Sequence, residues 1–297
     1  MKLGIMTGFD EGMIRFAKEV GFKSLELTFG PGDAVNASTV VSGDAEKVRK
    51  TCDDLGMTIS AIGWYANHLD PNLDERKKNA EYMAKMIDAA KALSVPVVCS
   101  FAGRDPEKSI EDNIPIFREV HSVTADYAEK KGIKIAFENC PMMDQHPFRS
   151  INMATTPAAW EMMFAAVPSK ALGLEYDPSH LYWQEVDYIA AIYSFGNRIY
   201  HMHAKDTEVM EGQLARQGIY GHGWWRYRIP GWGSVDWGRV FAALFDVGYT
   251  GGVDIEHEDP VFHGERFKEG FVRGYNTLSR YFYELPRMEE LPEAPPV

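Results

Sequence analysis

The chain has 297 residues, of which 45% are hydrophobic and 25% are charged, and its formal net charge is −12. Such a composition is that of an ordinary globular protein, so it excludes collagen-like and intrinsically disordered architectures. The negative charge repels phosphate backbones and anionic lipids, and the basic residues form only short clusters. Nucleic acids and membranes are therefore not expected as partners.

The cysteines and the first residues indicate the compartment. Cys52, Cys99 and Cys140 are widely spaced and odd in number, a pattern that favours neither a disulfide framework nor a structural zinc site. The segment 1–5 reads as the start of a strand rather than as a signal peptide, and every apolar stretch is too short for a transmembrane helix. We therefore expect a soluble protein of the cytoplasm.

Strand-like and helix-like segments alternate along the whole chain. Strand patterns occupy 2–7, 24–29, 58–65, 95–101, 133–139, 172–176, 199–204 and 252–256. Helical patterns follow them at 11–21, 44–55, 74–93, 110–131, 157–166, 186–195, 235–247 and 264–283, with a long loop before the seventh helix. Eight strand–helix units favour a single α/β domain, a closed (β/α)8 barrel over 1–285, with an open doubly wound sheet as the alternative.

Other parts of the sequence limit the cofactors and the end of the domain. No glycine-rich dinucleotide fingerprint follows the first strand and no P-loop occurs, so nucleotide cofactors are not expected. Residues 286–297 contain four prolines among glutamates, which predicts a flexible tail beyond the barrel.

Polar side chains recur on one face of the last four predicted strands. In the fifth strand Ile135 and Phe137 alternate with Ala136 and Glu138, because strand side chains alternate with a period of two. The same alternation groups polar side chains in the next three strands: Glu175 with Asp177, His201 with His203 and opposite Tyr200 and Met202, and Asp254 with Glu256. Residues that can bind a metal therefore lie at the ends of four consecutive strands, and all of them share the same face.

This polar face is expected to point into the barrel, whose top carries the active sites of barrel enzymes. Four side chains should then converge at the top, with Glu175, His201 and Asp254 supporting them from one layer below: Glu138, Asp177, His203 and Glu256. Three carboxylates and one imidazole suit a divalent cation, with Mn²⁺ first and Mg²⁺, Co²⁺, Zn²⁺ and Fe²⁺ as alternatives. Each acid alone is equally compatible with a salt bridge or a helix cap, but the shared phase favours a metal site.

Five segments carry a resemblance to a known family: 135–141 (IAFENCP), 174–181 (LEYDPSHL), 201–206 (HMHAKD), 230–237 (PGWGSVDW) and 253–259 (VDIEHED). In this order they resemble the xylose isomerase-like TIM barrels of the sugar phosphate isomerase/epimerase superfamily. The resemblance implies that the same four residues hold the ion. It also implies that Glu138 and Glu256 form an acid/base pair and that His180 binds a substrate oxygen. The superfamily includes endonuclease IV, but the fourth strand lacks the extra histidines of its zinc cluster.

These observations predict a metal-dependent sugar isomerase or epimerase. A carbonyl of a ketose or keto-sugar would be chelated and polarised by the ion, while Glu138 or Glu256 removes the neighbouring proton and the other returns one. If the next carbon carries a leaving group, the same site expels it. The alternative is therefore the catalytic subunit of a C-glycoside deglycosidase, a β-eliminating lyase of 3-keto-glycosides. An AP endonuclease and a non-catalytic sugar-binding protein rank below both.

Loop residues are expected to decide whether the reaction is isomerisation, epimerisation or elimination. His146 would serve as an extra base that favours elimination. Substrate contacts are predicted for Asp144, for Arg226 and Arg228 in an aromatic loop, and for the pair Trp64 and His68. Each of the aromatic or histidine side chains is also compatible with simple packing. The predicted partners are a small sugar or keto-sugar and, at the protein level, further copies of the chain or a small partner subunit.

Overall fold

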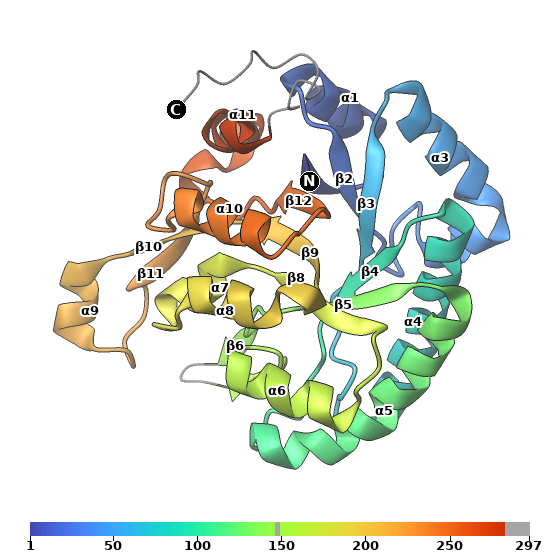
Figure 1. Cartoon of the computed structure of the whole chain (residues 1–297), viewed down its shortest axis with the longest axis horizontal. Helices are drawn as coiled ribbons and strands as arrows, with labels where there is room; N and C mark the ends of the chain where they lie inside the picture. The colour runs from blue at the N-terminus through green and yellow to red at the C-terminus, as the bar shows by residue number, and fades with distance from the viewer. Residues whose placement is uncertain (146–148, 283–297) are drawn as a thin grey trace, which may run out of the picture.

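The computed structural model describes residues 1–145 and 149–282, and Figure 1 shows a strand barrel ringed by helices. Within these residues eight parallel strands close in the order β1–β12–β9–β8–β5–β4–β3–β2. They are β1 (Lys2–Gly8), β2 (Ser24–Thr28), β3 (Thr58–Gly63), β4 (Val97–Ser100), β5 (Lys134–Glu138), β8 (Leu172–Tyr176), β9 (Ile199–Ala204) and β12 (Gly252–Ile255). The predicted barrel is confirmed, and the pairing of β1 with both β2 and β12 rules out an open sheet.

The outer helices follow the predicted series, with ends that differ by a few residues. They are α1 (Glu11–Val20), α3 (Ala45–Asp54), α4 (Leu73–Leu93), α5 (Ile110–Lys131), α6 (Pro157–Ala166), α8 (Tyr188–Phe195), α10 (Trp237–Asp246) and α11 (Phe267–Leu278). Local signals fix these ends. For example, the Asp10 side chain accepts a hydrogen bond from the Met13 amide, and Gly21 ends α1 at a left-handed φ of 115°.

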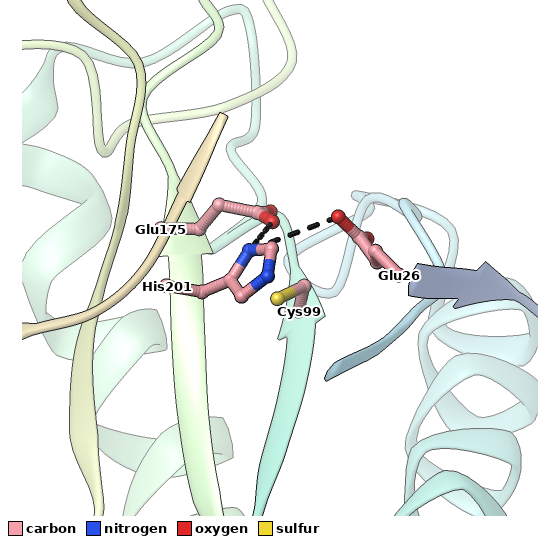
Figure 2. Close-up of side chains that lie close together, drawn as sticks. All are labelled: Glu26, Cys99, Glu175 and His201. Carbon is pink, nitrogen blue, oxygen red and sulfur yellow. Dashed lines mark hydrogen bonds and ion pairs between the residues drawn. The ribbon is translucent and has the colours of Figure 1, made fainter. Parts of the chain in front are cut away.

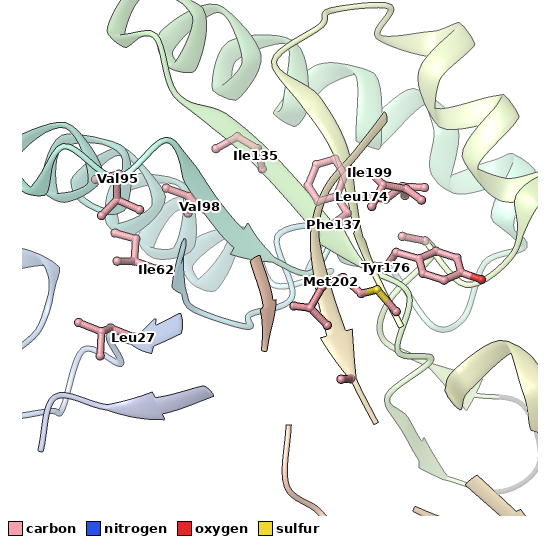
Figure 3. Close-up of a cluster of buried hydrophobic side chains, with 14 of the residues drawn as sticks. Leu27, Ile62, Val95, Val98, Ile135, Phe137, Leu174, Tyr176, Ile199 and Met202 are labelled. Carbon is pink, nitrogen blue, oxygen red and sulfur yellow. The ribbon is translucent and has the colours of Figure 1, made fainter. Parts of the chain in front are cut away.

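Apolar side chains on the outer face of the strands form the main core. Figure 3 shows part of this cluster, in which residues of neighbouring strands lie in one buried layer, for example Ile62, Val98, Ile135, Phe137 and Leu174. Smaller side chains fill the barrel interior, where Ala61, Val97, Cys99 and Ala136 form a separate cluster. The apolar face therefore packs outward and the face that carries Glu138 points inward, as the alternation predicted.

One strand departs from the predicted alternation. Tyr200 was expected on the outer face beside Met202, yet it packs against the interior cluster while Met202 lies in the outer core. The pairing of β8 with β9 shifts register between Leu174 and Glu175, which places one extra residue in β9. Such a bulge turns Tyr200 inward without changing the phase of the residues that follow it.

Several elements lie in segments that were expected to be loops. The long loop after β9 contains a hairpin of β10 (Asp206–Val209) and β11 (Trp225–Arg228), joined by α9 (Glu211–Gln217), which extends from the barrel in Figure 1. The helix α7 (Pro178–Trp183) follows β8 directly, and β6 (Met143–Gln145) pairs with β7 (Arg149–Ser150) after β5. Shorter turns are α2 (Ala37–Thr39), the π-helix Val40–Asp44 and the 3-10 turns Gly196–Arg198, Pro260–Phe262, Gly264–Arg266 and Ser279–Tyr281.

The predicted tail 286–297 and His146 lie outside the described residues. In the part of the chain that is described, none of the helices has the length and apolar character needed to cross a bilayer.

Candidate functional site

Four strand ends bring together the side chains that the sequence singled out. Glu138 ends β5, Asp177 follows β8, His203 lies near the end of β9, and Glu256 follows β12. One ligand-type atom from each of the four lies within 4.8 Å of those from the others. The His203 and Asp177 side chains are fully buried, and Glu256, the most open of the four, is 16% exposed. The predicted convergence of the four residues is therefore present.

His203 stands between the two glutamates of this cluster. Its Nδ1 atom lies 3.2 Å from Glu138 Oε1 and 3.2 Å from Glu256 Oε2. Because β5 and β12 are not neighbours in the barrel, the two carboxylates approach the imidazole from different sides of the mouth.

Asp177 is both a helix cap and a member of the cluster. Its Oδ1 atom accepts a hydrogen bond of 2.8 Å from the Ser179 amide at the start of α7. Its Oδ2 atom and His180 Nε2 are buried, lie 3.3 Å apart, and have no hydrogen-bond partner among the described residues. Burial, with the nearby Glu256 and Glu138 charges, raises the pKa of Asp177, although the His180 and Lys205 charges lower it. A bound cation would satisfy a buried carboxylate oxygen that lacks a hydrogen-bond partner.

Lys205 is the buried cation of the cluster and was not singled out from the sequence. It is 1% exposed, and its Nζ atom lies 2.5 Å from Glu256 Oε2, 2.8 Å from Glu258 Oε2 and 3.4 Å from Asp177 Oδ2. Lys205 and His203 hold the pKa of Glu256 well below its usual range, although burial alone would raise it. The lysine therefore keeps Glu256 ionised.

A second layer supports His203 from inside the barrel. Its Nε2 atom lies 2.7 Å from Glu26 Oε2 and 3.0 Å from Glu175 Oε1. The Tyr65 hydroxyl lies 2.5 Å from Glu26 Oε1 and 2.9 Å from Glu175 Oε2, so it ties the two carboxylates together. Burial lowers the pKa of His203, but Glu175 and Glu26 on one side of the ring and Glu256 and Glu138 on the other outweigh it and raise the pKa well above its usual value.

Figure 2 shows Glu26, Cys99, Glu175 and His201, which reach toward one another from different strands of the barrel. His201 Nδ1 lies 2.9 Å from Glu175 and its Nε2 lies 2.8 Å from Asp254, so both nitrogens face carboxylates. Burial lowers the pKa of His201, but the hydrogen bonds to Asp254 and Glu175 outweigh it and raise the value to about 10. As predicted, Glu175, His201 and Asp254 lie in the barrel wall beneath the cluster.

The predicted substrate contacts fall in different places. His180 lies in the cluster, with Nδ1 2.8 Å from the Tyr227 hydroxyl and Nε2 3.4 Å from Glu138. Arg226 and Arg228 lie on β11, where both pair with Glu208, and Arg228 also pairs with Asp259. These two arginines are therefore engaged by acids of the hairpin and of the loop after β12.

Trp64 and His68 lie in an aromatic cluster outside the barrel strands. Their rings contact each other, and Trp64 also contacts Tyr82 of α4. His68 is 2% exposed, bonds Ser100 and lies against His121 of α5. The contacts that the structure gives these rings are packing contacts, so their predicted role in substrate binding stays a prediction. For Asp144 only the backbone, in β6, is described.

One residue of the site, Glu26, had a signal in the sequence that the strand argument did not use. Glu26 alternates with Leu25 and Leu27 in β2, which is the pattern that identified Glu138 in β5. Tyr65 lies beyond the end of β3, although the strand was expected to reach it, and Tyr227 lies in the hairpin, in a segment expected to be a loop. They could be placed only once the fold was known.

The fold and the site together define a class of protein. The model of the xylose isomerase-like TIM barrel family matches residues 14–273, so the chain belongs to this family and the resemblance is confirmed. The chain is 26% identical over 288 residues to YfiH of Bacillus subtilis, an uncharacterised protein, covering 84% of this chain and 88% of YfiH. It is 24% identical over 242 residues to the inosose dehydratase of Geobacillus thermodenitrificans, covering 73% and 75%. The apo structure of the 3-keto-D-glucoside 4-epimerase YcjR from E. coli superposes with a TM-score of 0.72 at 16% identity, covering 94% and 99%.

Proposed function

We propose that this protein is a divalent-metal-dependent enzyme that isomerises or epimerises a ketose or keto-sugar by moving a proton next to its carbonyl. The observation that carries the proposal is the position of Glu138 and Glu256, which lie on different sides of the mouth and both reach His203 Nδ1. Two carboxylates flanking one position are the arrangement that proton removal and return require.

Glu138, Asp177, His203 and Glu256 would hold the cation, with Mn²⁺ as the first candidate and Mg²⁺, Co²⁺, Zn²⁺ and Fe²⁺ as alternatives. A bound divalent cation supplies Lewis-acid polarisation of a carbonyl and stabilises the negative charge that follows deprotonation. The donor set supports this role, because oxygen ligands dominate and Asp177 Oδ2 lacks a hydrogen-bond partner among the described residues.

The chain's own side chains would perform the proton transfers. Glu256, which is ionised beside Lys205, would accept a proton from the carbon beside the carbonyl, and Glu138 would return one. Return to the same carbon gives an epimer, whereas return to the neighbouring carbon gives an isomer. His180, oriented by Tyr227, would bind a substrate oxygen.

A second candidate is β-elimination, which includes the deglycosidase reaction on a 3-keto-glycoside. It is supported by the relationship to an inosose dehydratase, whose name denotes an elimination. The first step is shared with epimerisation, and the reactions differ in whether the neighbouring carbon carries a leaving group. His146 is our candidate for the additional base, with Asp144, Arg226, Arg228, Trp64 and His68 as further substrate contacts.

The test is incubation of the manganese-loaded protein in deuterated water with free ketoses and with a 3-keto-glycoside. Deuterium beside the carbonyl of an epimer or isomer supports the first candidate, and release of the aglycone supports the second. Glu138→Gln, which keeps the shape of the side chain but removes the base, serves as the control and should stop both. If no bound sugar gains deuterium or loses a group, a sugar-binding protein replaces the enzyme.

The rest of the proposal concerns the extent of the domain, its location in the cell, its partners and a weaker alternative activity. We propose one barrel domain over 1–285, a location in the cytoplasm, and either self-association or a small partner subunit. An AP endonuclease activity remains the weaker alternative, because it would place a polyanion against a chain with a net charge of −12.

A further inference from the structure

Two fully buried asparagines lie next to the ends of β4, β5 and β8, which are neighbouring strands of the barrel (Figure 1). Asn139 directly follows Glu138, the last residue of β5, and Asn152 follows β7. The last backbone pair between β5 and β8 joins Glu138 with Glu175. Buried backbone groups beyond this pair therefore need other hydrogen-bond partners.

Asn139 forms two hydrogen bonds with the backbone of Asp177. Its Nδ2 atom donates to the Asp177 carbonyl at 2.8 Å, and its Oδ1 atom accepts from the Asp177 amide at 2.7 Å. Asp177 lies beyond the last pairs that β8 makes with β5 and with β9. The asparagine side chain thus continues the pairing at a residue that belongs to the candidate metal centre.

Asn152 joins the end of β5 to the segment after β4. Its Nδ2 atom donates to the carbonyls of Glu138 and Cys140 at 2.8 Å and 2.7 Å. Its Oδ1 atom accepts from the Ala102 amide at 3.1 Å and from the Ala154 amide at 3.3 Å. A second buried amide group thus fixes the backbone of a second residue of the candidate metal centre.

We propose that Asn139 and Asn152 are positioning residues, which fix the backbones of Asp177 and Glu138 so that both carboxylates face the cation. Groups that orient metal ligands typically contribute about 10-fold to 100-fold to metal affinity. An apolar side chain could fill the same space, but it would leave the buried N–H and C=O groups without partners. The inference rests on the proposed function, because it concerns the cation that this function requires.

Asn113 of α5 provides a matched control, because it makes the same pair of hydrogen bonds with a residue outside the candidate metal centre. Its Nδ2 atom donates to the Asp105 carbonyl at 3.1 Å, and its Oδ1 atom accepts from the Asp105 amide at 2.8 Å. It also donates to the Ser109 carbonyl at 2.8 Å and is fully buried, like Asn139. The two asparagines therefore differ mainly in which residue they hold.

The test is titration of Mn²⁺ into chelator-treated Asn139→Ala, Asn152→Ala, Asn113→Ala and unmodified protein, with urea unfolding of the metal-free samples. Asn139→Ala and Asn152→Ala should each bind Mn²⁺ about tenfold more weakly. The electron paramagnetic resonance spectrum of their bound Mn²⁺ should also change, because it reports the arrangement of the ligands. Asn113→Ala should lose stability as Asn139→Ala does, but it should keep the affinity and the spectrum of the unmodified protein.

The two asparagine variants at the candidate metal centre are independent, so one of them suffices if the other does not fold. Unchanged affinity and an unchanged spectrum in either variant would overturn the assignment of that residue, and an equal loss of affinity in Asn113→Ala would overturn both assignments. The assay measures binding and not turnover. If the results are as expected but no sugar exchanges a proton, the proposed reaction fails while the inference stands. An unmodified protein that binds no divalent metal overturns both.

Discussion

Replacing Glu26 by alanine tests whether this residue holds His203 in the orientation that binds a cation. Glu26 Oε2 lies 2.7 Å from His203 Nε2, whereas Glu175 lies 3.0 Å from the same nitrogen. A hydrogen bond to a charged group contributes about 1.5–3 kcal/mol. Because Glu175 can keep part of the interaction, we expect the lower end of this range. Binding of Mn²⁺ should therefore weaken about tenfold, an effect of the size typical for groups that orient metal-binding histidines.

The assay is titration of Mn²⁺ into chelator-treated protein, with urea unfolding of the same samples to measure stability separately. Glu26→Gln should weaken binding less than Glu26→Ala, because the amide oxygen still accepts a hydrogen bond. Glu269→Gln is the control, since Glu269 pairs with Arg266 and Arg273 on the surface. Unchanged affinity in Glu26→Ala would refute the reasoning. Absence of Mn²⁺ binding by the unmodified protein would instead remove the metal from the proposal.

Three further predictions concern the ligands, the buried lysine and the buried histidines. Glu138→Ala and His203→Ala should each abolish stoichiometric binding of a divalent metal, measured by elemental analysis, and retention in both contradicts the assignment. Lys205→Met leaves three nearby carboxylates without their cation, so the metal-free variant should lose about 3–5 kcal/mol of unfolding free energy. Added Mn²⁺ should restore much of this loss, and equal losses with and without Mn²⁺ would contradict the electrostatic explanation. Burial lowers the pKa of His68 to about 3 and that of His121 to about 4. The unfolded chain therefore binds more protons below pH 6.5, so stability present above that pH is lost as pH falls toward 4. The loss is about 2 kcal/mol for each histidine at pH 5. His121→Gln does not titrate there, so its urea midpoint should fall less between pH 7 and pH 5, and an identical fall would contradict this account.

The parts of the fold that depend on local periodicity were predictable from the sequence. Alternation in β5 and the residue types at the ends of β8, β9 and β12 were sufficient to place Glu138, Asp177, His203 and Glu256 together. For Asp177 the helix cap weighed from the sequence is present, while its role as a metal ligand stays a prediction. Its Oδ1 caps α7, and its Oδ2 remains directed at the cluster.

The features that were not predicted depend on contacts between distant segments. Tyr200 turns inward because of a register shift between two strands, which has no signal in β9 alone. The structural role of the motif 230–237 also depends on a distant residue, Asp206. The buried Asp206 accepts hydrogen bonds from the Gly231 and Val235 amides and from Trp237 Nε1 at 2.8–3.0 Å. This motif anchors the segment that follows the hairpin.

Two groups of ligand-type residues lie in the barrel, and the hydrogen bonds of their carboxylates distinguish them. Each group contains a histidine with carboxylates at both nitrogens, His201 in the lower group and His203 in the upper group. The upper group holds three carboxylates and leaves Asp177 Oδ2 without a hydrogen-bond partner in the described residues, although Lys205 is near. A cation should therefore bind above His203 rather than below it. Cys99 belongs only to the lower group, and burial raises the pKa of its thiol well above the usual value. Cys99→Ser should consequently leave the Mn²⁺ affinity unchanged, and a loss comparable to that of Glu138→Ala would place the ion in the lower group.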